Sequence, residues 1–95
     1  MSARWTESAL ADLHAIEAAI ARHSPQYSQV MIERIFARVV RLETHPRLGP
    51  VVPEFGTEAI RELFEDPYRI VYRVEDDHVE VLAVVHAARR LPRGL

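Results

Sequence analysis

The chain has 95 residues, a formal net charge of −2, no cysteine and 48% hydrophobic residues. These values predict one domain over residues 1–95 with a modest core, and the lack of cysteine excludes disulfides and thiolate chemistry. An acidic chain is also a poor general binder of nucleic-acid backbone, because that affinity comes mainly from cationic contacts. With neither a signal-peptide pattern nor an apolar run of membrane length, we expect a cytoplasmic protein without contact to a membrane.

The first half of the sequence predicts a short strand followed by a pair of helices. Residues 3–5, "ARW", fit an edge strand, and Thr6 fits the N-cap of a helix that ends near His23. Apolar residues spaced by three and four define one face of this helix: Ala9, Leu13, Ile16 and Ile20.

The second helix begins at a strong break in the sequence. Ser24 is a capping residue, and Pro25 suits the first helical turn, where a missing N–H costs nothing. The helix should end near Thr44, because His45 precedes a proline. The short connection predicts an antiparallel helix hairpin.

After a loop over residues 46–57, three segments have strand character: "AIRELF", "YRIVYRV" and "HVEVLAVVHA". The acidic turn between the last two predicts a hairpin. In the last segment, simple alternation places Val85 on the face of Val79 and Val81, and His86 on the opposite face. We therefore expect an α+β fold, in which an N-terminal helix hairpin packs on a small, mainly antiparallel sheet of three to four strands. The other face of the sheet should stay open to a macromolecule.

The last strand ends in a histidine followed by cations. His86 can transfer protons near neutral pH, and Arg89, Arg90 and Arg93 can contact a phosphate or an acidic partner. The alternatives are a half-buried histidine that pairs with a loop carbonyl and a solvated tail.

Other candidates lie on the strands and the loop. Arg61, Arg69 and Arg73 are able to cluster on one face of the sheet, or to pair across strands with glutamates such as Glu62. Glu54 is a possible base, or a solvated loop carboxylate. The histidines show no metal-ligand spacing and no phosphate-binding motif is present, so we expect neither a metal nor a cofactor.

Several segments together resemble the RelE/ParE toxin superfamily of type II toxin–antitoxin systems. These are "WTESALADLHAI", "RLGPVVPEFG", "IRELF" and "PYRIVYRVEDDHVEVLAVVHAARR", and they span roughly residues 5 to 92. The resemblance implies a helix hairpin on an antiparallel sheet and neutralisation by a cognate, ParD-like antitoxin. Operator DNA would then be bound only through the antitoxin. Family members either cut mRNA on the ribosome or poison DNA gyrase.

Some nuclease members use a loop glutamate, a strand arginine and a C-terminal histidine and tyrosine. Here the resemblance assigns Glu54, Arg69, His86 and Arg89 to such a site, but no tyrosine follows His86, where Ala87 and Ala88 stand. The incomplete set, the acidic balance and the ending "HAARRLP" favour a ParE-like gyrase poison. A RelE-like mRNA endoribonuclease and a retired toxin that only binds its antitoxin are the alternatives.

A ParE-like toxin acts by surface contacts. For the target we expect these residues: Arg61, Arg69, His86, Arg89, Arg90 and Arg93. For the antitoxin we expect the arginine-bearing face of the second helix, with Arg34, Arg38 and Arg41, to pair with acidic side chains.

Overall fold

The computed structural model describes residues 1–92 and 94–95, and the prediction for Arg93 lies outside them. The elements follow the expected order of strand, helix pair and three strands. Their bounds are β1 Ser2–Trp5, α1 Glu7–Ala21, α2 Pro25–Val40, a short 3₁₀ turn Arg41–Glu43, β2 Ile60–Glu65, β3 Tyr68–Val74 and β4 His78–His86. In the part of the chain that is described, no helix has the length and apolar character needed to span a bilayer.

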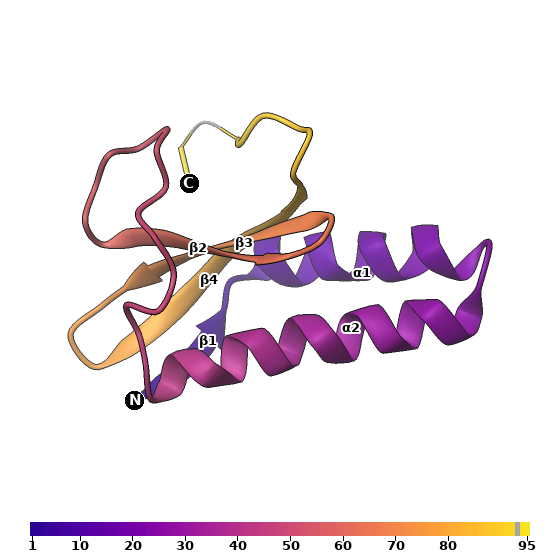
Figure 1. Cartoon of the computed structure of the whole chain (residues 1–95), viewed down its shortest axis with the longest axis horizontal. Coiled ribbons are helices and arrows are strands. Elements are labelled where there is room, and N and C mark those ends of the chain that lie inside the picture. The colour runs from indigo at the N-terminus through magenta and orange to yellow at the C-terminus, as the bar shows by residue number, and fades with distance from the viewer. Residues whose placement is uncertain (93) are drawn as a thin grey trace.

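Both helices begin at the predicted caps. The hydroxyl of Thr6 accepts a hydrogen bond from the backbone N–H of Ala9 at 3.0 Å, and Ser24 caps α2 by accepting from Tyr27 at 3.1 Å. Each cap satisfies one N–H of a first turn that has no partner within the helix. The two helices lie antiparallel and side by side (Figure 1).

The four strands form one sheet in the order β1–β4–β3–β2. The β2–β3 and β3–β4 pairs are antiparallel, whereas β1 pairs with β4 in parallel, from Ser2 opposite His78 to Trp5 opposite Val81. The predicted α+β fold with a mainly antiparallel sheet is confirmed.

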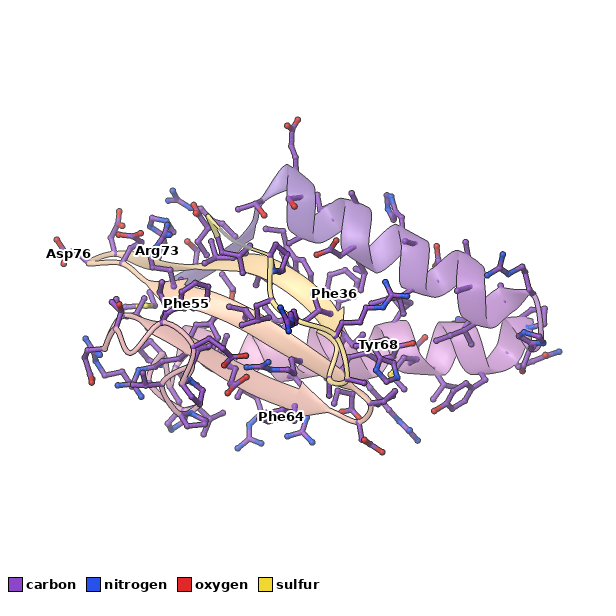
Figure 2. The ribbon with its side chains drawn as sticks, turned by 90° about the horizontal axis from the view of Figure 1, so that it is seen from above. Phe36, Phe55, Phe64, Tyr68, Arg73 and Asp76 are labelled. Atoms are coloured by element: carbon purple, nitrogen blue, oxygen red, sulfur yellow. The ribbon has the colours of Figure 1, made fainter. Side chains whose placement is uncertain are left out.

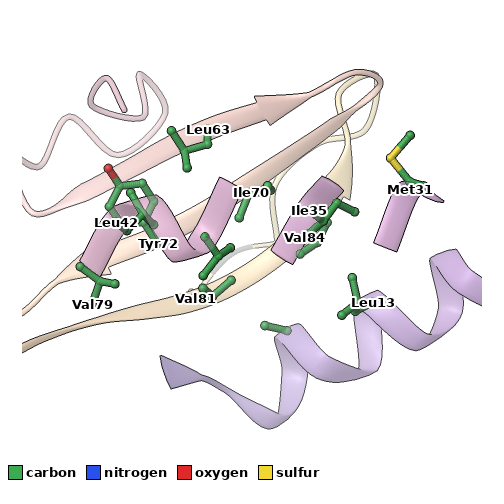
Figure 3. Close-up of a cluster of buried hydrophobic side chains, with 12 residues drawn as sticks. Leu13, Met31, Ile35, Leu42, Leu63, Ile70, Tyr72, Val79, Val81 and Val84 are labelled. Atoms are coloured by element: carbon green, nitrogen blue, oxygen red, sulfur yellow. The ribbon is translucent and has the colours of Figure 1, made fainter. Parts of the chain in front are cut away.

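The main core lies between the helix hairpin and the sheet. Figure 3 shows the helix residues Leu13, Met31 and Ile35 facing side chains of the strands, among them Ile70 and Tyr72. All five are almost completely buried. Each buried side chain of this size contributes about 1.5–3 kcal/mol through removal of apolar surface from water, so this layer holds the hairpin on the sheet.

A β-bulge in β4 corrects the predicted alternation of its side chains. Tyr72 pairs with Val81 while Val71 pairs with Ala83, so Leu82 is an additional residue on β4. Val81 and Val84 therefore both face the helices. Simple alternation had placed Val85, not Val84, on the face of Val81, and it fails because a bulge puts two residues opposite one.

The expectation of an open second sheet face is wrong. A second apolar cluster lies on that face, with Val52, Val71 and Leu82 buried and with Phe55 and Leu91 packed against them. Figure 1 shows the loop before β2 and the C-terminal segment on the side of the sheet opposite to the helices. The chain covers this face with its own loop and tail, because the valines and leucines there would otherwise be exposed to water.

Candidate functional site

Arg69 of β3 is the centre of an ion-pair cluster on the face that the loop covers. Its Nε donates to Glu62 at 2.6 Å, and its Nη1 and Nη2 donate to the two carboxylate oxygens of Glu54 at 2.8 and 3.1 Å. Arg69 is only 8% exposed and Glu62 only 4%. The guanidinium thus joins β2, β3 and the loop, and its two-pronged contact with Glu54 is the strong geometry for this pair.

The ion pair between Arg69 and Glu54 favours the charged form of both residues. Hydrogen bonds from Arg69 are the main cause of a lowered pKa at Glu54, so this carboxylate stays ionised at neutral pH. The hydrogen bond to Glu54 also raises the pKa of Arg69 further above its ordinary value, against the opposing effect of burial. A base held ionised by a salt bridge is a weaker proton acceptor, because taking up a proton costs it that bridge.

His86 lies in a different place, at the end of β4 beside α1. It borders a hollow of about 290 Å³ together with Asp12, Ala15, Tyr68 and Arg89. The rings of Tyr68 and His86 meet edge to face, with centroids 5.9 Å apart. The Nδ1 atom of His86 accepts from the backbone N–H of Ala88 at 3.1 Å, so this nitrogen is used locally.

The predicted acid–base residues are divided between the two faces of the sheet. His86 pairs with Tyr68 across the strands, and the next residue pair inward is Arg69 with Val85. Because neighbouring residues of a strand point to opposite faces, Arg69 lies with Val85 on the tail-covered face and His86 lies on the helix side. Arg89 accompanies His86, whereas Arg90 lines a separate hollow of about 370 Å³ with Glu54.

Arg61 lies at the other end of the sheet. Its Nη1 donates to the carbonyl oxygen of Gly49 at 2.9 Å and its Nε donates to that of Glu58 at 3.1 Å. Its side chain is 11% exposed and also pairs with the Glu58 carboxylate. Arg61 and Arg69 therefore bind the loop before β2. The prediction that both arginines lie on an open face of the sheet, free to contact a target, is corrected.

The three arginines predicted for the antitoxin do come together. Arg34 and Arg38 of α2 and Arg41 of the 3₁₀ turn that follows line a hollow of about 240 Å³ with Glu65 of β2. Arg38 donates to Glu65 at 3.1 Å, and the arginine remains 44% exposed. We call this surface, which Ala37 also lines, the basic groove. Figure 2 shows Tyr68 at the end of the sheet next to α2.

Two polar residues of the histidine hollow were not predicted as site residues. The carboxylate of Asp12 accepts a hydrogen bond from the backbone N–H of Val84 at 3.0 Å. Val84 lies on β4 beyond Val81, which is the last residue of that strand to pair with β1. Tyr68 opens β3, and burial is the main cause of its raised pKa. Nothing local in the sequence indicates either contact, because both join residues that are distant along the chain.

Comparison with known proteins agrees with this fold. The chain matches the family model described as ParE toxin of type II toxin–antitoxin system, parDE, over residues 3–91. It is 38% identical over 86 residues to a protein of Caulobacter vibrioides named Toxin RelE2, covering 90% of this chain and 93% of that protein. A solved structure described as the chromosomal ParDE TA system from P. aeruginosa superimposes with a TM-score of 0.75 at 25% identity, covering 90% of this chain and 95% of that one.

The chain belongs to the ParE toxin family of type II toxin–antitoxin systems. The predicted membership of the RelE/ParE superfamily is thereby confirmed.

Proposed function

We propose that this toxin is a ParE-like poison of DNA gyrase that acts by binding its target and has no catalytic centre of its own. The observation that supports this proposal is the separation of Glu54 and His86 on opposite faces of the sheet. A general base and a general acid must both reach one scissile phosphate within hydrogen-bonding distance. Two groups that line different hollows do not meet this requirement.

Arg69 supports the same reading. In a nuclease, an arginine at this place would stabilise the charge that develops on the phosphoryl oxygens. Here its guanidinium is paired with two carboxylates and is almost buried. Arg69, Glu54 and Glu62 together carry one positive and two negative charges. The net negative charge of this cluster repels a phosphate.

For the target contact we propose the last residue of β4 and the exposed segment that follows it. His86, Arg89 and Arg90 are all exposed and follow one another within five residues. Arg61 and Arg69 take part indirectly, because they fix the loop on which the tail lies.

The test compares two activities of the same purified protein. We expect inhibition of gyrase supercoiling and no cleavage of ribosome-bound mRNA. The Arg89→Ala/Arg90→Ala double variant should lose most of the inhibition, while Arg22→Ala, which removes an exposed arginine at the helix turn, should keep it. Intact gyrase activity at large molar excess, together with transcripts ending in a 2′,3′-cyclic phosphate, would establish the RelE-like nuclease instead.

The partner that we propose for the basic groove is an acidic segment of a cognate antitoxin. Arg34, Arg38 and Arg41 offer three cations along about two helical turns, beside an edge strand of the sheet. Operator DNA would be bound through that antitoxin. The Arg38→Glu/Arg41→Glu variant should bind the antitoxin at least tenfold more weakly, since like charges then face one another. Arg22→Glu changes the charge by two units at an exposed position elsewhere and serves as the control for each substitution. Unchanged affinity in the double variant would exclude the groove.

A further inference from the structure

Helix α2 carries a second exposed surface on the flank opposite to the basic groove. With about 100° between successive residues, Phe36 and Val40 point away from Arg34 and Arg38, and the buried stripe of the helix lies between the two flanks. Phe36 is 40% exposed, Val40 57% and Leu10 of α1 39%. Large apolar side chains gathered at one place on a small protein mark an interaction site more often than chance exposure does.

We group these three side chains with two partly buried neighbours, Trp5 and Ile32, and call the group the outer patch: Trp5, Leu10, Ile32, Phe36 and Val40. The rings of Trp5 and Phe36 lie with their centroids 5.1 Å apart. Leu10, Ile32 and Phe36 border a small hollow of about 130 Å³ between the helices. A hollow of this size accepts a single apolar side chain of a partner.

The charges around the outer patch are mainly acidic. Glu17 lines the hollow itself, Glu33 lies one turn before Phe36 on α2, and Glu7 lies one turn before Leu10 on α1. All three are exposed. His14 also borders the hollow. Arg4 lies near the turn between β3 and β4, where its charge adds to the larger effect of His78 in lowering the pKa of Asp77.

We propose that the outer patch binds a basic amphipathic helix of a partner protein. One apolar side chain of that helix would fill the hollow between Leu10 and Phe36, and flanking lysines or arginines would face Glu17 and Glu33. Helix-in-groove binding uses this combination of an apolar anchor with charges at its edge. The acidic segment that fits the basic groove is repelled here, so the two flanks of α2 select different partners.

The only tryptophan of the chain, Trp5, reports directly on this surface. The probes are two synthetic helical peptides of about 14 residues, with leucines at positions i, i+3, i+4 and i+7. One peptide carries lysines at its polar positions and the other carries glutamates. Titration of each peptide into the full-length protein is followed by Trp5 fluorescence.

The lysine peptide should shift the Trp5 emission and saturate, and the glutamate peptide should not. Phe36→Ser should weaken binding of the lysine peptide about tenfold or more, because the wall of the hollow is lost. Phe64→Ser is the matched control, since Phe64 is 49% exposed on β2 at the other edge of the sheet (Figure 2). Glu17→Lys/Glu33→Lys should weaken the lysine peptide about two- to fivefold for each charge and should admit the glutamate peptide.

Equal binding of both peptides, or an equal loss in the Phe36 and Phe64 variants, would overturn the proposal. So would a Trp5 shift that grows with protein concentration alone, because a second copy of the chain would then occupy the patch. Circular dichroism of each variant shows whether it is folded. A Phe36→Ser variant that fails this check is replaced by Phe36→Leu, which shortens the wall of the hollow and should still weaken the lysine peptide measurably.

Discussion

The guanidinium of Arg69 neutralises two carboxylates at a place with little access to water. Glu62 has a side-chain exposure of 5%, so its charge depends on this partner. A buried ion pair is costly to form, yet removing one member costs more, because the other charge is left unpaired. The cluster therefore makes Arg69 a structural residue regardless of any contact with a target.

Arg69→Met should destabilise the protein by about 3–5 kcal/mol, because the charge of Glu62 remains buried without a partner. A second substitution, Glu62→Leu, should restore much of this loss. Urea unfolding of the single and double variants measures both effects. If the single variant keeps wild-type stability, the ion pair does not hold this face of the sheet.

The lowered pKa of Glu54 predicts how stability depends on pH. A carboxylate with a depressed folded-state pKa stabilises the protein above its unfolded-state pKa, and this contribution is lost as the pH falls through the folded value. Wild type should exceed Glu54→Gln in stability by a constant amount from about pH 5.5 upward. The difference should narrow below the ordinary value of 4.5. Unfolding curves at a series of pH values test this, and a gap that widens in acid would contradict the assigned pairing.

At the scale of elements, the loop before β2 depends on one glycine. A Cβ on Gly49 would lie 2.0 Å from the carbonyl oxygen of Glu62. The backbone N–H of Gly49 also donates to the buried hydroxyl of Tyr72 at 3.0 Å. Gly49→Ala must push the loop from the strand, at a cost of about 1–3 kcal/mol or more. In Gly56→Ala the added Cβ has no atom within 4 Å, so the only loss of stability comes from the positive φ of 58° at this position. Thermal unfolding should rank Gly49→Ala below Gly56→Ala, and the reverse order would contradict this account.

The C-terminal segment acts as a cover for the second apolar cluster. Leu91 and Leu95 pack against it from beyond the last strand. Replacing both by serine should cost about 1 kcal/mol for each half-buried leucine and should increase the binding of a hydrophobic dye. Leu48→Ser, at a leucine that is 43% exposed, should change neither. Unchanged dye binding in the double variant would show that the tail contributes little to the cover.

The sequence predicted some elements closely and others poorly, for physical reasons. The caps at Thr6 and Ser24 and the bounds of β3 were predicted correctly, because the capping residues and the β-branched pattern are local signals. The bulge at Leu82 was not predicted, because an apolar residue fits either face when both faces are covered. For the same reason the arrangement of the candidate site could not be predicted: Arg69 and His86 were predicted as site residues, but their placement on opposite faces of the sheet depends on the bulge.

Across the whole molecule, the helix hairpin separates two surfaces of opposite character. The basic groove faces the edge of β2, and the outer patch faces the side of β1. Because they share no residue, occupation of one should leave the other accessible. The protein has principal-axis extents of 39 × 27 × 21 Å, so a partner of helix width can lie on each flank.

This arrangement predicts that an antitoxin in the basic groove and the lysine peptide on the outer patch bind together. The peptide's dissociation constant, measured through Trp5, should change less than twofold when the toxin is saturated with antitoxin, as expected for independent sites. Competition between the two ligands would mean that the antitoxin reaches around the hairpin and covers both flanks.

The additional residue in β4 has a chemical consequence for the scaffold. If Leu82 instead paired with Val71 in a regular ladder, every later residue of β4 would change faces, and His86 would point to the same face of the sheet as Arg69. The register of a single strand therefore decides whether His86 and Arg69 point to the same face of the sheet or to opposite faces.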